Sequence, residues 1–267
     1  MQPTDADKPN LLYKSPAFGD YNPGIKALLF DVFGTVVDWR RSITADLQQL
    51  FASSGIERDW EAFALDWRAL YDPSMARIRE GTRPFVTLDR LHRENLDTLL
   101  PAYDLETLTE SERDHINRTW HRLNPWDDIV PAQAKLKPAF ILATLSNGNI
   151  ELMVNLARHG GLTWDAILGA ELTQAYKPHP DAYLGSMNAL GLHPTECVMV
   201  AAHNADLAQA KQLGMLTAFV ARPDEYGTRQ TVDFVAEDAW DFIAEDMTAL
   251  ADQLLSAQRQ ATTHQRP

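Results

Sequence analysis

The sequence is poor in cysteine and in basic side chains, and it has no apolar run of the ~18 residues that cross a bilayer. The 24 Lys and Arg stand against 37 Asp and Glu, for a formal net charge of −13. Such a charge repels nucleic acid and anionic membrane surfaces, so we expect neither as a partner. The single Cys197 excludes a disulfide within the chain and a CxxC metal site, and its apolar neighbours predict a buried thiol. With no signal-like start, we expect a cytoplasmic location.

What is present is typical of a folded globular protein. Hydrophobic residues make up 45% of the 267 positions, enough for one large domain or two moderate ones. The two ends, residues 1–21 and 256–267, are polar or contain proline, and we expect loose extensions there.

Short apolar runs alternate with helical patterns along most of the chain. The runs begin with ALLF before Asp31 and continue at residues 139–146, 166–170, 197–202 and 216–221, while helical spacing occurs at 150–159, 181–190 and 205–213. This alternation predicts an α/β fold, a Rossmann-like, doubly wound parallel sheet formed by residues 22–38 and 125–255.

Residues 39–124 differ, because apolar residues recur there at helical spacing and no strand pattern is evident. They predict an inserted α-helical cap that leaves and rejoins beside the first strand. Three strands of the core end in Asp31, in Ser146, and in His203 with Asp206. Ligands of such sheets bind at the carboxyl ends of the strands, so a site is expected where these residues meet.

Four short motifs carry the chemistry. Asp31-Val32-Phe33-Gly34-Thr35-Val36 is followed by Ser146-Asn147-Gly148, Tyr176-Lys177-Pro178 and a final Asp206. Together, in this order and at strand ends, they resemble the haloacid dehalogenase superfamily over about residues 26–249. Most members of that superfamily are magnesium-dependent phosphatases with a second Asp two residues after the nucleophile. Here that position is Phe33, which cannot donate a proton, and the last motif offers one acid.

The resemblance is therefore to the L-2-haloacid dehalogenase branch, which works without metal or organic cofactor. It implies that Asp31 attacks C2 of a short, anionic 2-haloalkanoic acid, and that water hydrolyses the resulting ester to a 2-hydroxy acid. Two alternatives stay open: a magnesium-dependent phosphatase, and a hydrolase that releases another leaving group from a 2-substituted acid. A catalytically silent binding protein is disfavoured by the joint presence of Asp31, Lys177 and Asp206.

The resemblance also assigns roles to individual residues, each with an ordinary structural alternative such as a turn, a solvated face or core packing. Lys177 keeps Asp31 ionised, Thr35 orients it, and Arg68 on a helix of the cap contacts the departing halide. Ser146 binds the substrate carboxylate and Asn147 faces the leaving group. Val32, Phe33 and Tyr183 complete the substrate-binding set, and no metal ligand is assigned.

The last motif departs from the family pattern. His203 stands where an asparagine is usual, and Ala205 replaces an aromatic residue beside the halide. His203 and Asp206 could hold the hydrolytic water with His203 as base, or His203 could orient Asp206 or cap the next helix. Because the residue beside the halide differs from the family pattern, the sequence leaves open which halide is released, and fluoride is among the alternatives. Arg222, in the loop after the last main strand, is expected to form an ordinary salt bridge. Relatives often form homodimers, so a homodimer is a further expectation.

Overall fold

The structure is a computed structural model that describes residues 24–264, with side chains to residue 261. The expected extension at residues 1–21 lies outside the described residues. Five parallel strands form one sheet in the order β4-β1-β5-β6-β7. Their bounds are β1 Ala27–Phe30, β4 Ile141–Thr144, β5 Cys197–Ala201, β6 Leu216–Val220 and β7 Phe242–Ala244. A small antiparallel pair, β2 Val37–Asp38 with β3 Asn124–Pro125, lies apart from this sheet.

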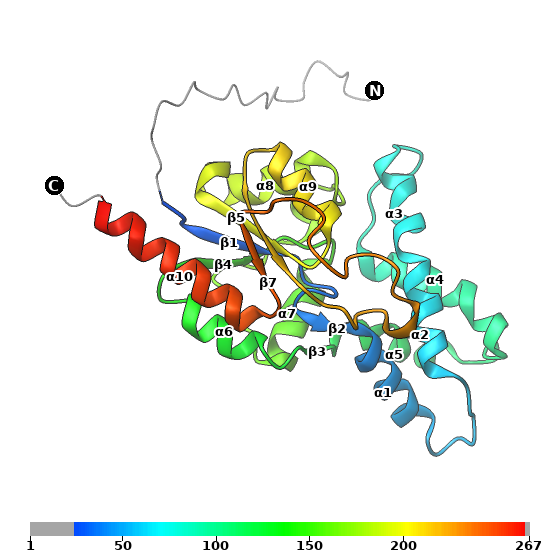
Figure 1. The fold of residues 1–267 in the computed structure, drawn as a ribbon. Coiled ribbons are helices and arrows are strands. Elements are labelled where there is room, and N and C mark those ends of the chain that lie inside the picture. The colour runs from blue at the N-terminus through cyan, green and yellow to red at the C-terminus, as the bar shows by residue number, and fades with distance from the viewer. Residues whose placement is uncertain (1–23, 265–267) are drawn as a thin grey trace, which may run out of the picture.

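Helices cover both faces of the sheet (Figure 1). Leu28 and Leu29 of β1 point to opposite faces, and both are fully buried. One face packs against α6 (Ile129–Leu136), α7 (Ile150–Gly160) and α10 (Met247–His264), the other against α8 (Pro180–Ala189) and α9 (Asn204–Gln212). This burial on two sides is why the strands read as continuous apolar runs. The predicted doubly wound parallel sheet is confirmed.

The strand predicted at residues 166–170 is wrong. Ala166 makes only an isolated bridge to Ala143. Side chains form the hydrogen bonds that a neighbouring strand would otherwise form with this segment. The Thr144 hydroxyl bonds both the N–H and the carbonyl of Leu168, at 2.8 and 2.9 Å, and Asp165 accepts from the Leu142 N–H at 2.9 Å. Conversely, the three-residue strand β7 follows a polar stretch and was not predicted.

The prediction of a loose tail from Ser256 is also wrong over residues 256–264, because α10 continues to His264. Leu250 and Leu254 are fully buried and hold this helix against the core. No helix within the described range is both long and apolar enough to span a bilayer.

Between β2 and β3 the chain forms the helical insertion, residues 39–123. Its helices are α1 Trp39–Phe51, α2 Trp60–Ala69, α3 Tyr71–Arg79, α4 Leu88–Leu99 and α5 Glu110–Asn117, with short turns of 3₁₀ helix at Leu100–Tyr103 and Arg118–His121. The carboxylate of Asp38 accepts from the Arg41 N–H at 3.1 Å and thereby starts α1 directly after β2. The insertion stands beside the sheet core, joined to it at β2 and β3 (Figure 1).

Candidate active site

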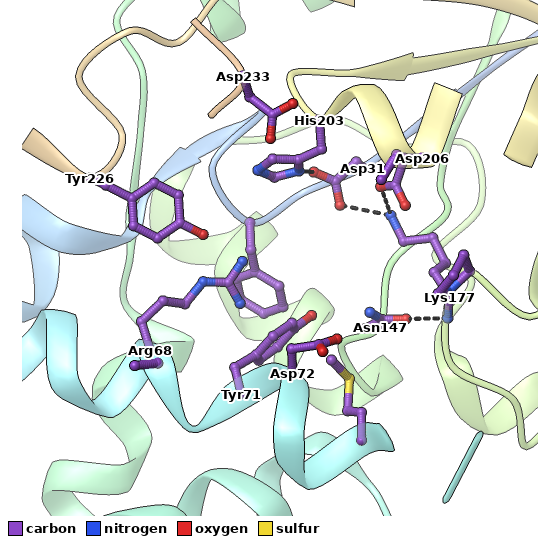
Figure 2. A pocket seen from close by; sticks show the side chains of 15 residues that line it. Asp31, Arg68, Tyr71, Asp72, Asn147, Lys177, His203, Asp206, Tyr226 and Asp233 are labelled. Atoms are coloured by element: carbon purple, nitrogen blue, oxygen red, sulfur yellow. Dashed lines mark hydrogen bonds and ion pairs between the residues drawn. The ribbon is translucent and has the colours of Figure 1, made fainter. Parts of the chain in front are cut away.

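A cavity of about 400 Å³ lies between the ends of the strands and helices α2 and α3 of the insertion (Figure 2). That volume suits a small molecule. The residues that line it include seven of those predicted from the sequence: Asp31, Phe33, Arg68, Asn147, Lys177, His203 and Asp206.

Asp31 follows β1 and is 6% exposed. Its Oδ1 accepts a hydrogen bond from Lys177 Nζ at 2.8 Å, and its Oδ2 accepts one from the Thr35 hydroxyl at 2.6 Å. Burial alone would raise the pKa of Asp31, but Lys177 and His203 outweigh it and hold the pKa far below its usual range. Asp31 is therefore an ionised carboxylate with little water around it.

Lys177 lies between two carboxylates. Its Nζ contacts Asp31 Oδ1 and also Asp206 Oδ2, at 2.5 Å, and the Tyr183 hydroxyl donates to Asp206 Oδ1 at 3.0 Å. Burial opposes the charge on Lys177, yet the two carboxylates raise its pKa, so the ammonium stays protonated. Asn147 Oδ1 accepts from the Lys177 backbone N–H at 2.7 Å, which fixes the orientation of its amide.

His203 lies between two further carboxylate oxygens. Its Nδ1 is 3.1 Å from Asp31 Oδ2, and its Nε2 is 2.9 Å from Glu225 Oε2. Burial would lower the pKa of His203, but Glu225 and Asp31 raise it well above 6.5, so both ring nitrogens carry protons. Of the roles weighed from the sequence, a side-chain cap to α9 is absent, and the His203 ring bonds Asp31 rather than Asp206. A role of His203 as base stays a prediction.

Glu225 was missed by the sequence reasoning. It is 2% exposed and also accepts from Trp39 Nε1 at 2.8 Å. It approaches Gly34 so closely that a Cβ there would lie 2.2 Å from Glu225 Oε1, and Gly34 has a φ of +85°, so both space and backbone require glycine. Its position in the loop after β6, at the carboxyl end of a strand, was the one sequence feature that pointed to the site. From the same loop, Arg222 pairs with Asp128 at 2.8 and 2.9 Å, the ordinary salt bridge expected.

Arg68 faces the charged cluster from α2 (Figure 2). Its guanidinium carbon lies 3.9 Å from the ring centre of Tyr71 and 5.6 Å from that of Trp39. Burial lowers the pKa of Arg68, but Tyr226, Tyr71 and Glu225 raise this pKa by more than burial lowers it. The guanidinium therefore keeps its charge. Within the described residues, the buried Nε and Nη1 of Arg68 have no hydrogen-bond partner. Two N–H groups therefore remain for an anion.

Ala205 places no aromatic ring at its own position in the cavity, but rings from other elements reach the same cavity. Phe33, Tyr71 and Tyr226 line the cavity, so aromatic rings reach it from the strand end, from α3 and from the loop after β6. The edge of Phe33 meets the Tyr71 ring, with 6.2 Å between the ring centres.

The other predicted residues are buried around the cavity and are not among the residues that line it. Val32 is buried, and Ser146 Oγ accepts from the Gly148 N–H at 3.1 Å, which is the turn weighed as its alternative. In the described part of the chain, the backbone N–H groups of Val32, Phe33 and Asn147 meet no acceptor. These groups can serve a bound carboxylate.

Asp31, His203 and Asp206 place one ligand atom each within 4.8 Å of one another, as a metal site would. The residues present nevertheless fit Mg²⁺ poorly. This ion requires an octahedron made mostly of oxygens, whereas the Lys177 ammonium lies between the two carboxylates and His203 is protonated.

Comparison with known proteins identifies the class. The family profile of haloacid dehalogenase-like hydrolases matches residues 25–214. The (S)-2-haloacid dehalogenase of Xanthobacter autotrophicus is 30% identical over 202 residues, which cover 74% of this chain and 76% of that protein. The (S)-2-haloacid dehalogenase 1 of Pseudomonas sp. (strain CBS-3) is 27% identical, over 76% of this chain and 88% of that protein.

Solved structures agree. The defluorinating L-2-haloacid dehalogenase Rha0230 is 46% identical, with a TM-score of 0.84 over 86% of this chain and 95% of that one. The L-2-haloacid dehalogenase PA0810 is 45% identical, with a TM-score of 0.85 over 87% and 100%. Fold, site and relatives define a hydrolytic enzyme with an α/β core. The chain belongs to the haloacid dehalogenase-like hydrolase family.

Proposed function

We propose that the protein hydrolyses short (S)-2-haloalkanoic acids to 2-hydroxy acids through an ester on Asp31, without a metal ion. One observation carries the proposal: an ionised, water-poor Asp31 faces Arg68, a cation with unpartnered donors, across a small cavity. A nucleophile on one side and an anion acceptor on the other are what displacement at a saturated carbon requires.

The surroundings of Asp31 favour Oδ1 as the attacking atom. Oδ2 accepts from Thr35 and lies within hydrogen-bond distance of His203, whereas Oδ1 accepts from Lys177 alone. An oxygen with fewer donors keeps more of its electron density. As the bond from Oδ1 to C2 forms, the carbon–halogen bond breaks, and the halide leaves with the bonding electrons toward Arg68.

Hydrolysis of the ester gives His203 its role as base. Esterification removes the charge of Asp31, so one of the two anions that raise the His203 pKa is lost, and a proton can pass to solvent while Glu225 keeps the Nε2–H. Water then attacks Cγ of Asp31 and gives a proton to His203 Nδ1. Collapse expels the 2-hydroxy oxygen, which takes the proton of the new carboxyl group, and Asp31 is again a carboxylate.

The free N–H groups of Val32, Phe33 and Asn147 and the hydroxyl of Ser146 are the groups we assign to the substrate carboxylate. The helical insertion acts as the cap over this site, since α2 and α3 supply the wall that faces Asp31. A homodimer and a cytoplasmic location remain predictions.

The test is a panel of chloro and bromo acids of two to four carbons, both enantiomers, with a chelator present. We expect equal release of halide and 2-hydroxy acid, no activity of Asp31→Ala, and a mass increase on Asp31 when the reaction is quenched. Loss of all activity in chelator, or phosphate release from phosphate esters with magnesium, would favour the phosphatase alternative. The Lys177 ammonium and Phe33 oppose that alternative.

A further inference from the structure

The wall of the cavity opposite Asp31 contains a hydroxyl group that the proposed reaction does not yet use. In-line displacement places the leaving group on the side of C2 away from the attacking oxygen. Arg68, Tyr71 and Asn147 occupy that side in Figure 2. Arg68 supplies charge, and the role of the Tyr71 hydroxyl depends on where its proton points.

The side chain of Asn147 indicates the direction in which the Tyr71 phenol proton points. Its Oδ1 is taken by the Lys177 backbone N–H, at 2.7 Å, so its NH₂ group is the end left for Tyr71. The Asn147 side chain acts to lower the pKa of Tyr71, as a donor to the phenol oxygen does, and an NH₂ group can only donate. No residue in the described part of the chain accepts the phenol proton. Burial raises the pKa of Tyr71, so this proton is retained at neutral pH.

The ring of Tyr71 is also held in place. The Arg68 guanidinium covers one face, 3.9 Å from the ring centre to the guanidinium carbon. Phe33 meets the ring edge-on, and His92 lies against it, with ring centres 6.2 and 6.0 Å apart. The phenol oxygen is therefore held at one position in the wall.

We propose that Tyr71 donates a hydrogen bond to the leaving group as the carbon–halogen bond breaks, and that this donor admits fluoride as a leaving group. This inference rests on the proposed dehalogenation. The electrons of the broken bond go to the halide, and Tyr71 keeps its proton. Fluoride concentrates its charge on a small atom and accepts hydrogen bonds most strongly of the halides, whereas chloride and bromide depend more on the charge of Arg68.

The test compares kcat/KM of the wild type and Tyr71→Phe on fluoroacetate, chloroacetate and bromoacetate. This constant reports the first irreversible step, so slow hydrolysis of the ester does not mask the effect. We expect a loss of about 10²-fold on fluoroacetate, near the effect of removing one donor from an oxyanion hole, and progressively smaller losses on the other two acids. Replacing Tyr71 with 3-fluorotyrosine, a more acidic phenol of nearly the same size, should raise the preference for fluoroacetate.

Tyr103→Phe is the matched control. It removes a hydroxyl from the same insertion, one that donates to Asp66 at 2.7 Å, and should leave the ratio of the three constants unchanged. Equal losses on all three acids in Tyr71→Phe would mark a structural role and overturn the inference. So would a wild type that releases chloride and bromide but no fluoride, although dehalogenation itself would stand. Halide release from none of the acids would instead refute the proposed function.

Discussion

The two sides of the cavity differ in whether their charged and polar groups have partners. The charged wall, from the sheet core, consists of Asp31, Lys177, His203, Asp206 and Glu225, and every charge in it meets an opposite charge. The aromatic wall, from the insertion, consists of Arg68 and Tyr71 with His92 and Trp120 behind them. Within the described residues, Arg68, His92 and Trp120 all have buried nitrogens without a partner.

In the reaction proposed above, the charged wall holds the nucleophile and the opposite wall receives the departing anion. Compensated charges fix Asp31 in one geometry and one ionisation state. Unpartnered buried donors cost about 1–3 kcal/mol each, so the aromatic wall is less stable than an apolar one of the same shape. For Arg68, which lines the cavity, this energy is recovered when an anion binds.

Arg68→Met should separate activity from stability. We expect kcat/KM for chloroacetate to fall by about 10³-fold, because the departing anion loses its cation. The free energy of unfolding should stay within about 1 kcal/mol of wild type, because methionine still packs against Tyr71 and Trp39 and only the cation–π contacts are lost. Halide assays and urea titration measure the two effects. A variant that loses stability together with activity would show that Arg68 belongs to the structural charges.

His203→Gln should block the second step and leave the first. A loss of the general base reduces turnover by about 10²-fold, while halide is still released once per enzyme molecule. Quenched-flow mass spectrometry should therefore find the Asp31 ester accumulating in the variant. Unchanged turnover would exclude His203 as the base, and loss of the single burst would give it a role in the attack by Asp31.

The same variant predicts a pH dependence of stability. His203 has a raised pKa when folded, between Asp31 and Glu225, so its contribution is fully present below its unfolded pKa of about 6.5. It is lost as the pH rises through the raised value. The wild type should thus exceed His203→Gln in unfolding free energy most at or below pH 6.5, with the gap closing on the alkaline side. A gap that widens with pH would contradict the protonated state.

His92→Phe should have the smallest effect on function. His92 is 1% exposed, neither of its ring nitrogens has a partner, and burial lowers its pKa to about 3, so it is neutral. Phenylalanine keeps the stacking on Trp120, whose ring centre is 4.1 Å away. We expect a gain of about 1 kcal/mol in unfolding free energy and kcat/KM within about twofold of wild type. Chemical denaturation and the chloroacetate assay measure both.

The sequence predicted those features of the fold and the site that depend on the local pattern of residues. Strands β1, β4, β5 and β6 are apolar runs buried on both faces, and Asp31, Lys177 and Asp206 follow predicted strands or their loops. Residues 166–170 also read as such a run, but whether a run joins a sheet depends on tertiary partners, here the side chains of Thr144 and Asp165. Glu225 and Tyr71 lie in a loop and at a helix start with no motif around them, and only the packing of distant segments brings them to Asp31.

The contact between Glu225 and Trp39 has a mechanical consequence. Trp39 is the first residue of α1, where the insertion leaves the core, and its indole N–H shares the Glu225 carboxylate with His203. A movement of the insertion about this joint would therefore displace Glu225, which anchors the imidazole. Glu225 thus links the first residue of the insertion to His203, the residue we propose as base.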